Sequence, residues 1–171
     1  MNDVSADIIE KARQIRLLLM DVDGVLTDGR LYFGPTGEEL KVFHVRDGQG
    51  LVNWHAAGLR SGIISGRNSP IVELRGKQLG IEFIYQGRNE KVSALNEMIL
   101  EAAVLREEVA FIGDDIADRE VFPFVGLAVA VADAQHDVRA AAHLVTKNKG
   151  GRGAVREVID LLLESRDLGQ S

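Results

Sequence analysis

The sequence predicts an α/β fold: a Rossmann-like parallel sheet with helices on both faces, a β-hairpin after the first strand and no large cap domain. Short apolar runs that end in glycine, acidic or other turn residues are typical of buried parallel strands. Segments with helical periodicity lie between these runs, which is typical of a sheet covered on both faces. The 171 residues fit one domain of ordinary size, so we expect residues 1–171 to form a single domain.

The predicted strands are short apolar runs, each followed by turn residues. In parallel sheets of this kind, ligands bind beyond the carboxyl ends of the strands. The residues that directly follow the runs are therefore the first candidates for a functional site. The runs are residues 17–20, 62–64, 81–85, 109–112 and 127–131.

The predicted helices are marked by caps and by apolar periodicity. One helix is expected to end at Gly58, and another to begin at Ser69-Pro70 and to end at Gly80, since proline suits a first turn and glycine a helix end. Two further segments have apolar residues at helical spacing. The predicted helices cover residues 51–57, 70–79, 92–102 and 155–163.

One stretch interrupts this alternation and predicts a β-hairpin at about residues 30–45. Its arms are residues 31–33 and 40–45, and Gly34-Pro35-Thr36-Gly37 provides the turn. Because a lone hairpin is marginally stable in water, we expect this one to pack against copies of itself in an oligomer.

Composition excludes several classes of function. The chain has no cysteine, so disulfides, cysteine nucleophiles and thiolate metal sites are ruled out. Its formal net charge of -6 gives no reason to expect nucleic-acid binding. The start lacks the pattern of a signal peptide, and its longest apolar run is far too short to span a bilayer. We therefore expect a cytoplasmic protein that binds neither nucleic acid nor membranes.

Paired carboxylates follow the first predicted strand, in the segment from Asp21 to Asp28. Asp21 and Asp23 lie two residues apart on a turn and can converge on one site. One carboxylate would attack phosphorus, and the other would protonate the leaving oxygen and later activate water. An isolated Asp-x-Asp is more often a solvated turn that caps a helix. The sequence on both sides favours the catalytic interpretation here.

A second acidic group follows the fourth predicted strand and consists of Asp114, Asp115 and Asp118. Oxygen ligands of this kind suit Mg²⁺, and Asp21 and Asp114 could each supply a carboxylate. The alternative is a helix N-terminus rich in Asp, which the helix dipole favours. Because clustered carboxylates repel one another without a cation, the two acidic groups together favour a metal site.

Two further segments could bind a phosphoryl group. Ser65 follows the second predicted strand, and Gly66 leaves the adjacent backbone amide accessible, so both could donate hydrogen bonds to phosphoryl oxygens. Lys91 begins a predicted helix and could bind phosphate as a point charge. Taken alone, Ser-Gly is a common turn and a lysine near a helix start is usually solvated.

Together these residues resemble the four motifs of the haloacid dehalogenase superfamily, in order. The motif residues are Asp21-x-Asp23, Ser65, Lys91 and Gly113-Asp114-Asp115-x-x-Asp118. Within the superfamily, residues 21–29, 45–48, 66–67 and 150–157 look like the 3-deoxy-manno-octulosonate 8-phosphate phosphatase family. That resemblance covers nearly the whole chain after Arg16.

The resemblance implies hydrolysis of this sugar-acid phosphate in lipopolysaccharide precursor synthesis. Asp21 would become phosphorylated, and Asp23 would act as general acid and then base. Mg²⁺ would be held by the side chains of Asp21 and Asp114 and the backbone carbonyl of Asp23. Ser65 and Lys91 would bind the phosphoryl group, with Asp115 and Asp118 as supporting acidic residues. The substrate-binding residues implied by the family are Arg46, Asp47, Gly48, Gly66, Arg67 and Arg75.

The spacing of the motifs leaves no room for a large lid domain. Members of this lidless type are homotetramers in which hairpins meet at the centre and a neighbour closes each site, so the resemblance implies a homotetramer here. Residues 147–171 would form a C-terminal tail and helix. The basic, glycine-rich residues 147–153 are expected to form a flexible tail over an anionic site, or else an ordinary linker.

Three alternatives stay open at this point. The substrate could be a nine-carbon ulosonate phosphate. A phospho-receiver signalling domain would also use a phosphorylated Asp, an acidic pair, a hydroxyl and a Lys. In receivers, however, the acidic pair comes early and the phosphorylated Asp in mid-chain. A catalytically idle oligomerisation module would not need the complete set of motif residues.

Overall fold

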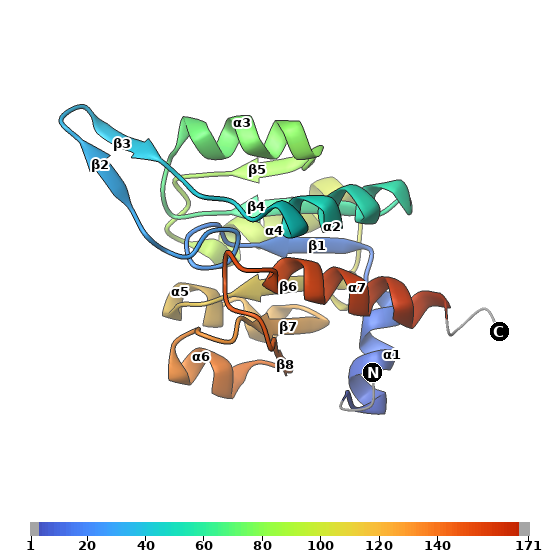
Figure 1. The fold of residues 1–171 in the computed structure, drawn as a ribbon. Coiled ribbons are helices and arrows are strands. Elements are labelled where there is room, and N and C mark those ends of the chain that lie inside the picture. The colour runs from blue at the N-terminus through green and yellow to red at the C-terminus, as the bar shows by residue number, and fades with distance from the viewer. Residues whose placement is uncertain (1–3, 168–171) are drawn as a thin grey trace.

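A parallel six-stranded sheet forms the centre of the protein (Figure 1). The computed structural model describes residues 4–167. The strand order β5-β4-β1-β6-β7-β8 places the first strand in the middle, between β4, which precedes Ser65, and β6, which precedes Asp114. The sheet strands are β1 Leu17–Met20, β4 Arg60–Ile64, β5 Phe83–Tyr85, β6 Val109–Gly113, β7 Leu127–Ala130 and β8 Leu144–Val145.

The burial of the central strands explains why their sequences are continuously apolar. Every residue of β1, β6 and β7 is buried. A strand covered on both faces has no solvent side, so both sets of its alternating side chains enter the core. The predicted α/β fold with a parallel sheet is confirmed, and β8 is a short edge strand that the sequence analysis did not predict.

Helices cover both faces of the sheet. The long helices α2 and α7 pack on each other and on one face, and α4 lies behind the sheet in Figure 1. No helix within residues 4–167 is long and apolar enough to cross a membrane. The helices are α1 Ala6–Gln14, α2 Val45–Ala56, α3 Pro70–Leu79, α4 Lys91–Ala102, α5 Ile116–Arg119, α6 His136–Ala141 and α7 Ala154–Asp167.

The hairpin is shorter than predicted, and α2 is longer. Its strands are β2 Tyr32–Gly34 and β3 Gly37–Leu40, and it projects from the body of the protein (Figure 1). The second arm does not continue to Val45, because helix α2 begins there. His44 caps this helix, since its side chain accepts a hydrogen bond from the backbone N–H of Arg46 at 3.3 Å. Three of the residues expected to bind substrate, Arg46, Asp47 and Gly48, thus lie in the first turn of a helix.

Of the two alternatives for residues 147–153, a flexible tail or an ordinary linker, the structure favours the linker. These residues form a loop that is hydrogen-bonded on both sides. Gly150 N–H donates to Asp133 at 3.0 Å, and Gly151 N–H donates to the carbonyl of Val25 at 2.8 Å. A Cβ added to Gly150 would lie 1.6 Å from the carbonyl oxygen of Gly24. The glycines therefore allow the loop to pack against the turn that follows β1.

Candidate active site

Three neighbouring strands bring the predicted polar residues to one edge of the sheet. Strand β1 pairs with β4 on one side and β6 on the other, so that Met20 lies opposite Ile63 and Ile112. The backbone N–H of Asp21 donates to the carbonyl of Ile112 at 3.1 Å. Asp21, Ser65 and Asp114 therefore all follow adjacent strand ends, where ligands bind in parallel sheets.

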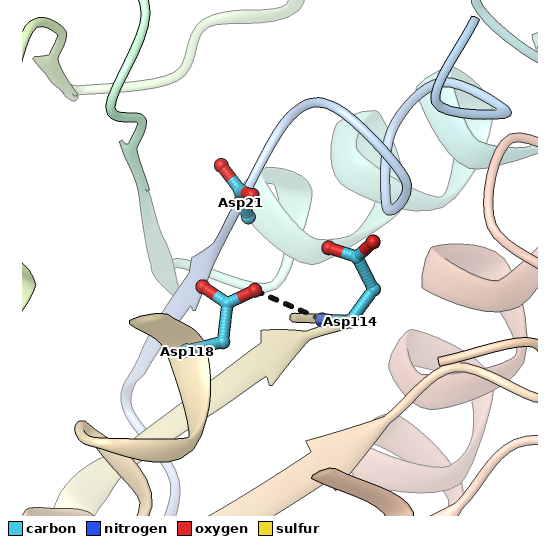
Figure 2. Close-up of side chains that lie close together, drawn as sticks. All are labelled: Asp21, Asp114 and Asp118. Atoms are coloured by element: carbon cyan, nitrogen blue, oxygen red, sulfur yellow. Dashed lines mark hydrogen bonds between the residues drawn. The ribbon is translucent and has the colours of Figure 1, made fainter. Parts of the chain in front are cut away.

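Three carboxylates converge at this edge. Oxygen atoms of Asp21, Asp114 and Asp118 all lie within 4.8 Å of one another, and Figure 2 shows the three side chains around a common space. Asp118 is fully buried and is fixed by the backbone: one of its oxygens accepts from the N–H groups of Asp114 at 2.9 Å and Asp115 at 3.1 Å. The short helix α5 thus aims Asp118 back at the end of β6.

Lys91 provides a positive charge within this cluster. Its ammonium nitrogen lies 3.1 Å from Asp21 Oδ2 and 2.7 Å from Asp118 Oδ1, and the residue is only 5% exposed. Burial by itself lowers the pKa of Lys91, but the charges of Asp21 and Asp118 outweigh it and raise that pKa above its ordinary value. Lys91 therefore stays a cation at the site.

One lysine does not neutralise three carboxylates. Burial and the charge of Asp118 raise the pKa of Asp21 to about 6. Burial, together with the charges of Asp118 and Asp21, raises the pKa of Asp114 to about 8. Carboxyls with raised pKa values indicate negative charge that the protein's own groups leave uncompensated.

The cluster fits a hard divalent cation. Asp114 Oδ1 is buried without a hydrogen-bond partner among the described residues, which is unusual for a buried oxygen unless an ion or a water completes it. Both oxygens of Asp118 are already engaged by Lys91 and by backbone N–H groups. Asp21 and Asp114 are therefore the side chains best placed to hold the ion.

Asp23 points to a different set of partners. Its carboxylate is paired through Oδ1 with Lys41, at 2.5 Å, and through Oδ2 with Arg67, at 3.5 Å. Sequence reasoning missed Lys41. Its neighbours Leu40 and Val42 are exposed, whereas the Lys41 side chain is 1% exposed, so the chain turns its charged residue inward. A lysine between apolar residues gives no such signal in the sequence.

Ser65 is buried at the end of β4, 3% exposed. Its backbone N–H donates to the carbonyl of Tyr85, and its hydroxyl oxygen accepts from the N–H of Arg67 at 3.3 Å. A Cβ on the exposed Gly66 would meet no atom closer than 3.8 Å, so there is open space beside its backbone. Asp115 is exposed and caps α5, where it accepts from the N–H of Ile116 at 2.8 Å.

Two of the other predicted substrate residues, Arg46 and Asp47, have different surroundings. Arg46 is exposed and lines a cavity of about 730 Å³ together with Arg152 and Arg156, away from the three carboxylates. Asp47 is 1% exposed, and its oxygens accept from the N–H groups of Gly153 at 3.2 Å and Arg156 at 2.8 Å. Its carboxylate is therefore engaged with the start of α7.

Gly48 allows Arg75 to approach helix α2. A Cβ at Gly48 would lie 2.6 Å from a terminal nitrogen of Arg75, whose guanidinium lies 5.9 Å from the ring centre of Phe43. The Nε atom of Arg75 is buried and has no hydrogen-bond partner within residues 4–167. The substrate-binding roles of these residues stay predictions.

Comparison with known proteins adds independent findings. A family model described as haloacid dehalogenase-like hydrolase matches residues 62–159. The 3-deoxy-D-manno-octulosonate 8-phosphate phosphatase of Escherichia coli (strain K12) is 51% identical over 160 residues, which cover 94% of this chain and 85% of that protein.

Solved structures agree with this similarity. The 3-deoxy-D-manno-octulosonate 8-phosphate phosphatase from Yersinia pestis superposes with a TM-score of 0.94 at 48% identity, covering 96% of this chain and 89% of that one. The enzyme from Moraxella catarrhalis, in complex with a magnesium ion, a phosphate ion and a KDO molecule, has a TM-score of 0.91 at 38% identity, covering 94% and 92%. The chain belongs to the haloacid dehalogenase-like hydrolase family, within its group of 3-deoxy-D-manno-octulosonate 8-phosphate phosphatases.

Proposed function

We propose that this protein hydrolyses 3-deoxy-D-manno-octulosonate 8-phosphate to the free sugar acid and phosphate through a phosphoaspartate on Asp21. The observation that carries the proposal is the convergence of Asp21, Lys91 and Asp114 at one sheet edge. The identity of about half of the residues to phosphatases of this name supports the substrate.

The two steps use Asp21 and Asp23 differently. In the first, the Asp21 carboxylate attacks phosphorus, the bond from phosphorus to the sugar oxygen breaks, and the Asp23 carboxyl gives that oxygen its proton. In the second, Asp23 takes a proton from a water molecule, whose oxygen attacks phosphorus as the bond to Asp21 breaks. The net result is hydrolysis, with both residues restored.

The charged groups around Asp21 suit phosphoryl transfer, which depends mainly on positioning and charge neutralisation. Asp21 and Asp114 would hold Mg²⁺, and the backbone carbonyl of Asp23 stays the predicted third protein ligand. When bound, the ion supplies positive charge that offsets the repulsion between the carboxylates and the phosphate. Lys91, already held between Asp21 and Asp118, would bind the phosphoryl oxygens, and Ser65 and the N–H of Gly66 would donate to them.

The sugar acid would be bound by arginines at the rim of the site. Arg67 is the best placed, because it already contacts Asp23. Arginine binds a carboxylate through its planar fork. Arg46 and Arg75 stay proposed contacts, whereas Asp47 and Gly48 would act by fixing the first turn of α2.

The assembly and setting of the enzyme are also proposals. The hairpin exposes large apolar residues to solvent (Leu31, Tyr32, Phe33, Leu40 and Val42). Clustered apolar side chains on a projecting element support an oligomer interface, and the homotetramer remains the expectation. A single domain and a cytoplasmic location stay proposals from the sequence, and a role in lipopolysaccharide precursor synthesis is proposed on the family resemblance.

The test is phosphate release from a panel of eight- and nine-carbon ulosonate phosphates, with and without Mg²⁺. We expect the highest kcat/KM with 3-deoxy-D-manno-octulosonate 8-phosphate, and none of this activity with a metal chelator. Asp21→Asn should reduce kcat at least about 10³-fold, because the nucleophile is lost. The matched control is Asp137→Asn, since Asp137 is exposed on α6 and its loss should leave kcat unchanged.

Two other results would decide against parts of the proposal. A clear preference for a nine-carbon substrate would overturn the substrate assignment but keep the mechanism. Undiminished phosphate release by Asp21→Asn would overturn the mechanism.

A further inference from the structure

The second arm of the hairpin is followed by a buried cation, Lys41, that lies next to Asp23. Lys41 directly follows β3, and its side chain is 1% exposed although the flanking Leu40 and Val42 are about half exposed. A lysine is almost never buried unless it is paired. Its ammonium nitrogen lies 2.5 Å from Asp23 Oδ1, so the partner is the carboxylate that the proposed mechanism uses as acid and base.

A second cation reaches Asp23 with help from the other arm of the hairpin. Arg67 Nε lies 3.5 Å from Asp23 Oδ2, and the Arg67 guanidinium lies 5.6 Å from the ring centre of Phe33, in β2. Such a position over an aromatic face is attractive for a cation. Each oxygen of Asp23 is therefore held by a cation, one following β3 and one resting on β2.

Asp23 needs such support because the metal cluster does not provide it. Lys91 holds the carboxylates of Asp21 and Asp118, and backbone N–H groups also fix Asp118, but Asp23 is not among the three converging carboxylates. A general acid must lie within hydrogen-bond reach of one particular oxygen. A freely rotating aspartate side chain on a turn would spend much of its time away from that position.

We propose that Lys41 is a positioning residue that holds the Asp23 carboxyl group in place for proton transfer, and so connects the hairpin to the active site. The inference rests on the proposed function, because it takes Asp23 as the acid and base. Lys91 and Ser65 are the residues proposed to bind the phosphoryl group, whereas Lys41 forms an ion pair with Asp23. Its removal should therefore impair proton transfer more than substrate binding.

The first test substitutes Lys41→Met, which keeps an unbranched side chain only one heavy atom shorter and removes the charge. With 3-deoxy-D-manno-octulosonate 8-phosphate we expect kcat to fall about 10- to 100-fold, part of the 10²–10⁴-fold that general acid–base catalysis contributes. KM should change less than about 3-fold. Lys41→Arg should recover at least part of kcat, since it restores a cation next to Asp23.

The second test separates the two chemical steps with p-nitrophenyl phosphate. Its leaving group needs no proton, so Lys41→Met should form the phosphoenzyme quickly, but hydrolysis of the phosphoaspartate still needs Asp23 as base. Stopped-flow should therefore show a burst of p-nitrophenolate larger than that of the wild type, followed by a slow steady rate. General structural damage would slow both phases and give no such burst.

The matched control is Lys77→Met, on helix α3, where the lysine is largely exposed and paired with Glu73; its kinetics should equal those of the wild type. Thermal unfolding of each variant checks that it is folded. Retention of kcat within about 2-fold by Lys41→Met, or equal loss in both phases, would overturn the inference. Other results would contradict the proposed function and not the role of Lys41. If Asp21→Asn kept its activity, the proposed mechanism would be wrong. If the wild type preferred another sugar phosphate while Lys41→Met still gave the burst, only the substrate assignment would be wrong.

Discussion

Gly24 determines the position of a carboxylate that lies far away in the sequence. It has φ of +94°, and a Cβ there would lie 2.0 Å from Asp114 Oδ2. Two demands thus meet at one residue: a left-handed backbone and direct contact with the proposed metal site. Only glycine satisfies both, because any other side chain is strained in this conformation and would also displace Asp114.

Gly24→Ala should therefore weaken Mg²⁺ binding and activity together. We expect a loss of about 10- to 100-fold in apparent Mg²⁺ affinity, the size found when groups supporting metal ligands are changed. The measurement is phosphate release as a function of Mg²⁺ concentration. The control is Gly37→Ala: Gly37 also has a positive φ, of +124°, but a Cβ there meets nothing within 4 Å. If both variants lose the same amount, backbone strain rather than contact with Asp114 is the cause.

At the scale of elements, the start of α2 shows how one helix is completed by another. Residues 45–48 contain a glycine and polar side chains, so their local sequence does not indicate a helix. The structure adds this turn because His44 caps it, and because Asp47 accepts hydrogen bonds from the N–H groups of Gly153, just before α7, and Arg156, in its first turn. Burial raises the pKa of Asp47, although those hydrogen bonds oppose the shift. No sequence pattern near Asp47 indicates a hydrogen-bond partner more than a hundred residues away, such as Gly153.

Within the part of the chain that the structure describes, the hairpin and its flanks expose several large apolar side chains close together in sequence. Leu40→Gln should reduce the fraction of the largest oligomer, because a buried polar amide in an apolar interface costs free energy. Light scattering after size-exclusion chromatography would show this loss of oligomer as a lower mean molar mass at the same protein concentration. The matched control is Leu100→Gln on α4, a leucine that is 81% exposed. An unchanged mass for Leu40→Gln would speak against a hairpin interface.

For the whole molecule, the acidic cluster couples metal binding to stability. The carboxyls of Asp21 and Asp114 have pKa values of about 6 and about 8, above the ordinary value of 3.8. A raised acid pKa means that the unfolded chain releases these protons first, so each group lowers stability progressively as pH rises from about 4 to its folded value. Without a divalent ion, these groups make the protein less stable at about pH 8 than at about pH 5.

Mg²⁺ should reverse this trend, since it binds the ionised carboxylates and competes with protons. At about 100 times its Kd, the ion would stabilise the fold by about 2.7 kcal/mol, a rise in Tm of about 5–10 °C for a chain of this size. Differential scanning fluorimetry should show a larger rise at about pH 8 than at about pH 5.5. Asp114→Asn should remove most of the Mg²⁺ effect. A Tm rise that is equal at both pH values would contradict the prediction.

The sequence by itself determined the parallel sheet and the place of the site. Strands β1 and β6 and the apolar end of β4 (residues 62–64) were predictable because burial on both faces requires continuous apolar runs. The chain places Asp21, Ser65 and Asp114 just beyond the ends of these strands. Loop residues 147–153 left two alternatives open in the sequence, because glycines that permit close packing against Gly24 look in sequence like glycines of a flexible tail.

Only the tertiary structure decided which charged groups meet. Lys91 lies between Asp21 and Asp118, Lys41 turns inward to Asp23, and Asp47 holds the start of α7. The physical reason is one of range: apolar periodicity and caps act between neighbours in the chain, and so can be read locally. Ion pairs between distant residues depend on how the elements pack, which local patterns do not encode.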